Sequence, residues 1–173
     1  MIASNIFLVG PMGAGKSTVG KQLAKSLGRD FFDSDKEIER RTGVSISWIF
    51  EMEGEAGFRA REQKVIEELT DKKNIVLATG GGAILSADNR RVLRSRGYVV
   101  YLSASVDQLL RRTSKDKNRP LLQTGEPKKQ IAELLAFRDP LYKDVADVEL
   151  RTGDQSIQYV VSGLIKKLEN LDK

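Results

Sequence analysis

The stretch NIFLVGPMGAGKSTVG, residues 5–20, decides the fold of this chain. Its first five residues are mostly apolar and predict a buried strand, and the residues from Lys16 onward have the apolar spacing of an amphipathic helix. Between them, residues 10–17 match the pattern G-x-x-x-x-G-K-[ST], the P-loop, in the strand-turn-helix context that this motif requires.

This turn has the chemistry of a phosphate site. Its glycines let backbone N–H groups point inward, and the helix N-terminus adds partial positive charge. Lys16 can reach the β- and γ-phosphates, and Ser17 can ligate Mg²⁺. The residues expected to bind ATP here are Gly13, Ala14, Gly15, Lys16, Ser17 and Thr18. An accidental glycine-rich turn is the alternative, but the lysine, the hydroxyl and both flanks favour a nucleoside triphosphate.

Composition limits the chemistry that is available. The 173 residues, 40% hydrophobic and 31% charged, suit one globular domain with a hydrophobic core. The chain has no cysteine and no histidine, which excludes thiol nucleophiles, cysteine-bound zinc and a histidine general base. Carboxylates, lysine, arginine, hydroxyls, backbone amides and a hard cation are left.

The net charge of +5 suggests an anionic partner. The basic residues are mixed with acidic ones, and aromatic residues make up only 6%, so we expect small anionic ligands rather than nucleic acid. No apolar run approaches the ~20 residues of a membrane span, and residues 1–15 do not resemble a signal peptide. We expect a cytoplasmic, monomeric protein that binds no membrane.

Short apolar runs alternate with amphipathic stretches along the whole chain, which is typical of an α/β domain with a parallel sheet. Strands are predicted at residues 5–9, 30–33, 74–79, 98–102 and 145–150. Helices are predicted from Lys16, at 36–42, 46–52 and 56–69, from about Ser86, from Ser105, from Pro127, and over a last stretch that begins near Ile157. Residues 113–125 have no periodicity and are the place for a mobile element.

Two further clusters belong to the same edge of such a sheet, where ligands bind. Asp33 and Asp35 end the second strand, where one acid could lie by the metal and the other by an acceptor hydroxyl. A helix N-cap plus a solvated acid is an equally good reading. Three glycines, residues 80–82, follow the third strand and permit close approach of a ligand, or form only a loose turn. Because no aspartate ends the third strand, Asp33 is the candidate carboxylate for the metal.

Six short motifs, taken together, resemble those of a known enzyme family. GPMGAGKST, DSD, GFR at 57–59, TGGG at 79–82, RP at 119–120 and RDPLY at 138–142 resemble shikimate kinase in order and spacing, nearly end to end. The resemblance implies a three-layer P-loop kinase fold of class α/β, with a five-stranded parallel sheet in the order 2-3-1-4-5. It implies one domain over 1–173, with a substrate-binding region at about 33–61 and a lid at about 113–125. The implied reaction moves the ATP γ-phosphoryl to the 3-hydroxyl of shikimate, in the pathway to chorismate.

Carried over by position, the resemblance assigns the shikimate site to Asp35, Arg59, Gly81, Gly82 and Arg138. Asp35 would accept from the ring hydroxyls, and the two arginines would hold the carboxylate, which a guanidinium fork suits. Without the resemblance, Arg59 reads as a helix-surface arginine and Arg138 as a stabiliser of a helix C-terminus. Phe50 and Phe58 could wall the ring or belong to the core.

The resemblance also assigns the rest of the nucleotide site. Arg119 in the lid would reach the phosphates, Arg112 would lie against the adenine, and the turn ending near Gln155 would form the other side of that pocket. The expected catalytic residues are Lys16, Asp33, Asp35 and Arg119. Mg²⁺ would bind Ser17 directly and Asp33 through water, while Asp35 orients the acceptor hydroxyl and can take its proton.

Rival interpretations stay open at this stage. A gluconate kinase on the same fold would also need arginines for a carboxylate. A GTP-dependent switch is disfavoured because the chain lacks Asn-Lys-x-Asp. A non-catalytic nucleotide-binding regulator would keep the P-loop but would not need two acids, a triglycine and an arginine-bearing lid together.

Overall fold

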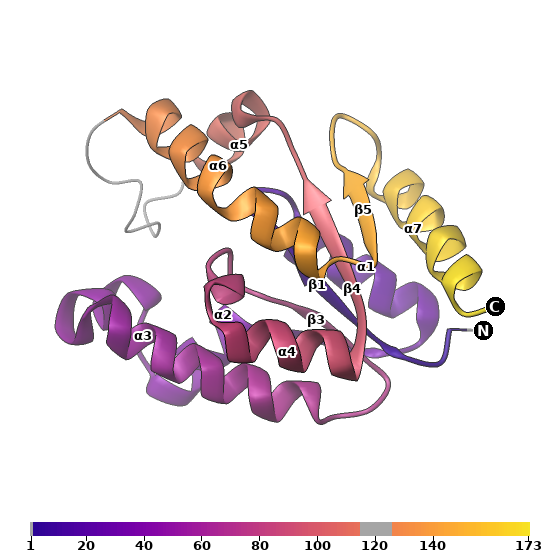
Figure 1. Cartoon of the computed structure of the whole chain (residues 1–173), viewed down its shortest axis with the longest axis horizontal. Coiled ribbons are helices and arrows are strands. Elements are labelled where there is room, and N and C mark those ends of the chain that lie inside the picture. The colour runs from indigo at the N-terminus through magenta and orange to yellow at the C-terminus, as the bar shows by residue number, and fades with distance from the viewer. Residues whose placement is uncertain (1, 115–125) are drawn as a thin grey trace.

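The computed structural model describes residues 2–114 and 126–173 (Figure 1). Its centre is a parallel five-stranded sheet in the order β2-β3-β1-β4-β5, as the resemblance to shikimate kinase implies. The strands are β1 (Asn5–Val9), β2 (Asp30–Asp33), β3 (Ile75–Ala78), β4 (Gly97–Ser103) and β5 (Val148–Arg151). Each predicted strand is present, with bounds that differ by up to three residues.

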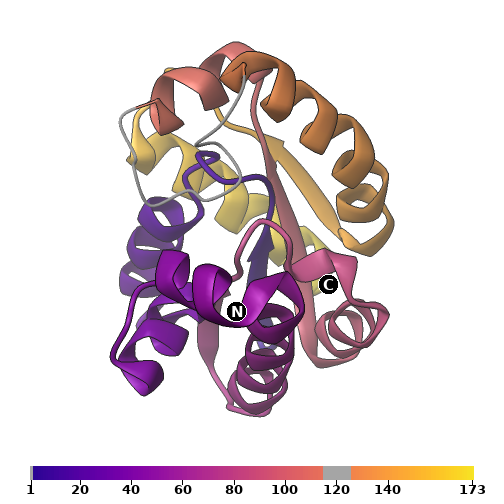
Figure 2. The same ribbon diagram turned by 90° about the vertical axis from the view of Figure 1, so that its left-hand side faces the viewer.

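The helices cover both faces of the sheet. They are α1 (Lys16–Leu27), α2 (Ser34–Thr42), α3 (Ile46–Thr70), the short 3₁₀ helix η1 (Ala83–Leu85), α4 (Ala87–Arg96), α5 (Val106–Thr113), α6 (Pro127–Val145) and α7 (Ile157–Leu171). In Figure 2 the sheet stands between α1 on one side and α4 and α6 on the other. The sequence did not predict η1.

Two hydrophobic cores lie on the two faces of the sheet. One joins β1 and β4 to α1 and α7, and the other joins the opposite side of the same strands to α2, α3, α4 and α6. Ile6, Phe7, Leu8 and Val9 of β1 are completely buried, because a central parallel strand has helices on both sides. This rigid centre fixes the carboxyl ends of the strands, where the predicted site residues lie.

Two helices differ from the prediction in an instructive way. The expected helices at 46–52 and 56–69 form one element, α3, with a kink at Gly54, whose φ of 74° is not helical. Helix α6 begins at Pro127 as predicted but runs past Pro140 to Val145. Arg138 therefore lies inside a helix, and the reading of Arg138 as a stabiliser of a helix C-terminus is wrong.

Helix termini follow the local sequence closely. Ser105 and Gln108 form the predicted capping box at the start of α5, and Ser86 caps α4.

In the part of the chain that the structure describes, no helix combines the length and the apolar character needed to cross a bilayer.

Candidate active site

A cleft of about 460 Å³ opens at the carboxyl ends of the strands. Most of the predicted site residues line it: Gly13, Gly15, Lys16, Ser17, Thr18, Asp33, Asp35, Arg59, Gly81, Gly82, Arg112 and Arg138. Ala14 of the P-loop is fully buried, and Gln155 lies outside the cleft lining. Arg119 and residues 115–125 of the predicted lid lie outside the described residues.

The P-loop wraps around the start of α1. Gly13 and Gly15 have φ values of 88° and 94°, a conformation that residues with a Cβ rarely adopt, so the turn needs glycine at both positions. The Lys16 ammonium donates to the carbonyls of Gly10 and Pro11 at 2.7 and 2.8 Å. A buried lysine side chain held in this way places its charge within the loop, where the phosphates of a nucleotide would lie.

Asp33 is a helix N-cap, and it also lies beside Ser17, where the sequence predicts a metal-side carboxylate. Its Oδ1 accepts from the backbone N–H groups of Asp35 and Lys36, which makes it the N-cap of α2. Its Oδ2 accepts from the Ser17 hydroxyl at 2.5 Å. A hydroxyl and a carboxylate side by side beside a phosphate loop form an oxygen donor pair that suits Mg²⁺, which keeps several waters and takes one or two protein ligands. Among the described residues, no group of three acidic side chains gathers to form a fuller cage.

The opposite flank of the P-loop is tied to the turn after β5. Arg112 donates to the carbonyls of Gly13 and Gly153, both at 3.0 Å, and Gln155 accepts from the Gly153 N–H. The two segments predicted to enclose the adenine are thus joined through Gly153. Thr152 adds a hydrogen bond to the carbonyl of Ala14 at 3.0 Å, so this turn also supports the P-loop from below.

The triglycine turn after β3 brings the acceptor side of the cleft together, because each glycine lies against a different group. A Cβ on Gly80 would lie 2.7 Å from an Asp35 oxygen and 2.9 Å from a Glu62 oxygen. One on Gly81 would lie 3.6 Å from Arg138, and one on Gly82 would lie 2.3 Å from the Arg59 guanidinium. A side chain on Gly80 or Gly82 would displace a site residue, so the turn is a close approach and not a loose connection.

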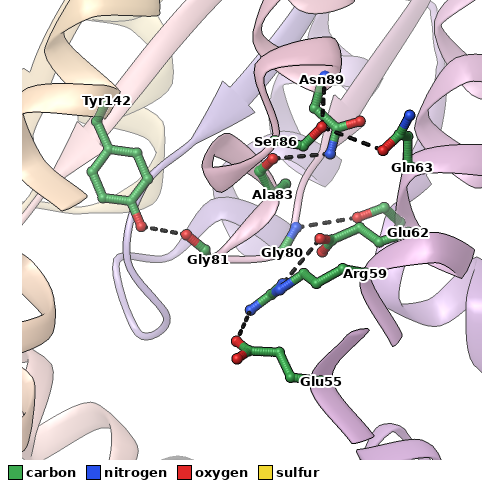
Figure 3. A network of polar contacts seen from close by, with 11 residues as sticks. Glu55, Arg59, Glu62, Gln63, Gly80, Gly81, Ala83, Ser86, Asn89 and Tyr142 are labelled. Carbon is green, nitrogen blue, oxygen red and sulfur yellow. Dashed lines mark hydrogen bonds and ion pairs between the residues drawn. The ribbon is translucent and has the colours of Figure 1, made fainter. Parts of the chain in front are cut away.

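The two arginines have different surroundings. Arg59 is 22% exposed and pairs with Glu62 at 2.9 Å and with Glu55 at 3.3 Å (Figure 3). Arg138 is only 4% exposed, its Nε has no hydrogen-bond partner, and none of the described carboxylates lies within ion-pair distance of it. The Glu62 carboxylate is near enough to interact with Arg138 electrostatically but forms no direct ion pair with it. A buried guanidinium without a direct ion pair is unfavourable unless an anion binds, so this part of the cleft favours a carboxylate or phosphate.

Glu62 was not singled out from the sequence. It is completely buried beneath Arg59, and its Oε2 has no hydrogen-bond partner. Burial raises the pKa of Glu62 to about 7, the Asp35 carboxylate adds to this, and Arg59 opposes it. The sequence could have indicated this residue, because Glu62 lies within the apolar stripe of α3, where an acid needs a partner, and Arg59 precedes it by three residues.

Ser34 and Tyr142 were also missed, although both lie in motifs that the sequence analysis quoted. The Ser34 hydroxyl accepts from the Gly80 N–H at 3.1 Å, and the Tyr142 hydroxyl donates to the Gly81 carbonyl at 2.5 Å. Tyr142 follows Arg138 by one helical turn and therefore shares its face of α6. Both side chains hold the triglycine turn.

Aromatic side chains close one wall of the cleft. Phe50 and Phe58 line it, with ring centroids 4.8 Å apart. Phe58 is 3% exposed and belongs to the core, which confirms that interpretation, while its contact with a substrate ring stays a prediction.

Comparisons with known proteins agree with this geometry. The family model described as Shikimate kinase matches residues 12–169. A shikimate kinase 1 from Yersinia pestis is 58% identical over 167 residues, which cover 96% of each chain. The solved structure of shikimate kinase from Acinetobacter baumannii in complex with shikimate superposes with a TM-score of 0.96 at 53% identity, covering 97% of this chain and 94% of that one.

A second solved structure extends the likeness to a more distant relative. Shikimate kinase from Bacteroides thetaiotaomicron has a TM-score of 0.88 at 36% identity, with 96% of this chain and 98% of that chain covered. The family model spans most of the chain, and the motifs that it includes line one cleft. This chain belongs to the shikimate kinase family.

Proposed function

We propose that this protein transfers the γ-phosphoryl group of ATP to the 3-hydroxyl of shikimate, giving shikimate 3-phosphate and ADP in the pathway to chorismate. The observation that carries the proposal is the pairing, in one cleft, of a P-loop with a buried arginine that forms no direct ion pair with a described carboxylate. The first suits a nucleoside triphosphate, and the second suits the carboxylate of the acceptor.

The acceptor would lie between α2, α3, α6 and the triglycine turn. Arg138 and Arg59 would hold its carboxylate, with the backbone of Gly81 and Gly82 beside it. Asp35, on the wall of the cleft next to Gly80, would orient the attacking hydroxyl and accept its proton. The aromatic pair Phe50 and Phe58 would pack against the ring.

The phosphates would lie in the P-loop, with Lys16 and the loop amides stabilising charge as the γ-phosphoryl leaves. Ser17 directly, and Asp33 through water, would hold Mg²⁺, which when bound neutralises phosphate charge. Positioning of donor and acceptor supplies most of the catalysis in such a reaction, because its transition state is loose.

Further parts of the proposal follow from the sequence resemblance. The whole chain, 1–173, would act as one kinase domain, with acceptor binding in about 33–61 and a lid at about 113–125. Arg119 would act from the lid, which would exclude water as a competing acceptor. Arg112 and the turn at Gln155 would enclose the adenine. A cytoplasmic location, a monomeric state and the lack of nucleic-acid or membrane partners stay predictions.

The test is ADP release from ATP and Mg²⁺ with shikimate, with gluconate, and with neither. We expect release that depends on shikimate and a background rate with gluconate. Turnover with gluconate but not with shikimate would show a different small-acid kinase on the same fold. ATP binding with no turnover on either acid would favour a nucleotide-binding regulator.

A further inference from the structure

The triglycine turn, Gly80–Gly82, has two side-chain anchors. The Ser34 hydroxyl of α2 accepts from the N–H of Gly80, and the Tyr142 hydroxyl of α6 donates to the carbonyl of Gly81. Figure 3 shows the tyrosine reaching the turn from the side opposite Arg59 and Glu62. The turn is thus fixed between the two helices that face each other across the acceptor side of the cleft.

The rest of the turn is bonded to itself. The Ala83 N–H donates to the carbonyl of Gly80, and the Leu85 N–H donates to that of Gly82, both at 3.1 Å. No described residue accepts from the N–H groups of Gly81 and Gly82. These two donors are therefore available to an anionic ligand, and their directions depend on how the carbonyls of the same peptide units are held.

Tyr142 holds the carbonyl that matters most for these donors. A peptide unit is planar, so fixing the Gly81 carbonyl fixes the direction of the Gly82 N–H in the same unit. Glycine by itself would leave this peptide free to rotate, since three consecutive residues lack a Cβ. Tyr142 is completely buried, and burial raises the pKa of its hydroxyl to about 12, so the group is a proton donor throughout the physiological range.

The same side chain lies beside the buried arginine. Arg138 and Tyr142 are one turn apart on α6, and the Arg138 guanidinium lies against Gly81. The Tyr142 ring in turn packs on the ring of Tyr101, with centroids 4.8 Å apart, and the Tyr101 hydroxyl donates to Asp139 at 2.7 Å. This places Tyr142 between the sheet, the turn and the arginine.

We propose that Tyr142 is a positioning residue for the acceptor's carboxylate: its hydroxyl holds the Gly81–Gly82 peptide so that the free amides and Arg138 face the same anion. It does not touch the reacting atoms. The inference rests on the proposed function, because it assumes that a carboxylate binds between Arg138 and the turn.

The test compares Tyr142→Phe with Tyr101→Phe. Each variant removes one buried hydroxyl from the same stacked pair, but only the first removes the bond to the turn. For Tyr142→Phe we expect the KM for shikimate to rise about 10-fold and the KM for ATP to stay within about 2-fold. For Tyr101→Phe we expect both KM values to stay within about 2-fold, with a comparable loss of thermal stability.

The outcomes separate the possibilities. An unchanged KM for shikimate in Tyr142→Phe, with only a lower Tm, would reduce Tyr142 to a structural role and overturn the inference while leaving the proposed function intact. Equal rises in KM for both variants would also overturn it. If the wild-type protein shows no turnover that depends on shikimate, the proposed function fails and the inference fails with it.

A measurement on the wild-type protein covers the case in which Tyr142→Phe does not fold. In the absence of any ligand, the amides of Gly80, Ala83 and Leu85 should be protected from hydrogen exchange, as hydrogen-bonded groups of a fixed turn are. Exchange at the rate of an unfolded peptide would show that the turn is not fixed in the free protein, and would overturn the inference.

Discussion

The phosphate side of the cleft comes from one continuous stretch, residues 10–18, whereas the acceptor side gathers residues from α2, α3, α6 and the turn after β3. The first is built mainly of backbone, held by glycine conformations and by one lysine. The second is built of charged side chains, two of which, Glu62 and Arg138, are buried. A local motif is therefore enough to form a phosphate site, whereas selective binding of a small acid needs groups that only the fold brings together.

The largest expected effect is at Asp35, where the two sides meet. Asp35→Asn keeps the size of the side chain but removes the charge that orients the acceptor hydroxyl and takes its proton. We expect kcat to fall about 10³-fold while ATP binding is retained, measured by ADP release and by nucleotide titration. Asp30→Asn, at the exposed start of β2, is the matched control and should stay within about 2-fold of wild type. Wild-type kcat in Asp35→Asn would remove this residue from the mechanism.

Lys16 tests the phosphate side. Lys16→Met removes the ammonium that the P-loop carbonyls hold and leaves an apolar chain of similar length. The expected loss in kcat is roughly 10²- to 10³-fold, because a preorganised donor to the developing charge is gone. Lys21→Met, on the exposed face of the same helix, should change neither kcat nor KM by more than about 2-fold. If the two variants behave alike, Lys16 does not contribute and the loop backbone alone stabilises the phosphates.

The phosphate side could be predicted from the sequence because strand, turn and helix are contiguous there. The order of the sheet came with the family resemblance, and the strands could be placed from the apolar runs. Asp33 shows the limit of local reasoning: the pattern left an N-cap and a metal-side acid as alternatives, and the carboxylate both caps α2 and accepts from Ser17, so the two do not exclude each other.

The acceptor side was harder to predict for physical reasons. Pro140 suggested that a helix ends near Arg138, yet the helix continues and buries the arginine. Glu62 lies in an apolar stripe of α3, and no local pattern shows that a second arginine and a second acid will surround it. Ser34 and Tyr142 act on a turn that is 46 and 61 residues away in the sequence, so their role depends on the sheet topology.

The two arginines allow a comparison within the acceptor side. Arg138→Ala should raise the KM for shikimate about 10²-fold, because the ligand loses its contact with a desolvated guanidinium that forms no direct ion pair within the protein. Arg59→Ala should raise it less, about 10-fold, because Glu62 and Glu55 already compete for that guanidinium. The KM for ATP should change by less than about 3-fold in both variants. An unchanged KM for shikimate in Arg138→Ala would take Arg138 out of the site.

The smallest expected effect is a dependence of stability on pH through Glu62. The pKa of Glu62 in the folded protein is about 7, above its ordinary value of 4.5, so between these values the folded state holds a proton that the unfolded state has lost. Stability from this group is therefore fully present below about pH 4.5 and is lost as pH rises to about 7.

The comparison is with Glu62→Gln, whose amide cannot ionise. Relative to this variant, the free energy of unfolding of the wild-type protein should fall by on the order of 2 kcal/mol over that pH range, measured by urea unfolding. Glu55→Gln is the matched control, since Glu55 also pairs with Arg59 but is 54% exposed, and its unfolding curves should run parallel to those of wild type. If Glu62→Gln also runs parallel to wild type, Glu62 is ionised throughout and the acceptor side carries one more negative charge than this geometry implies.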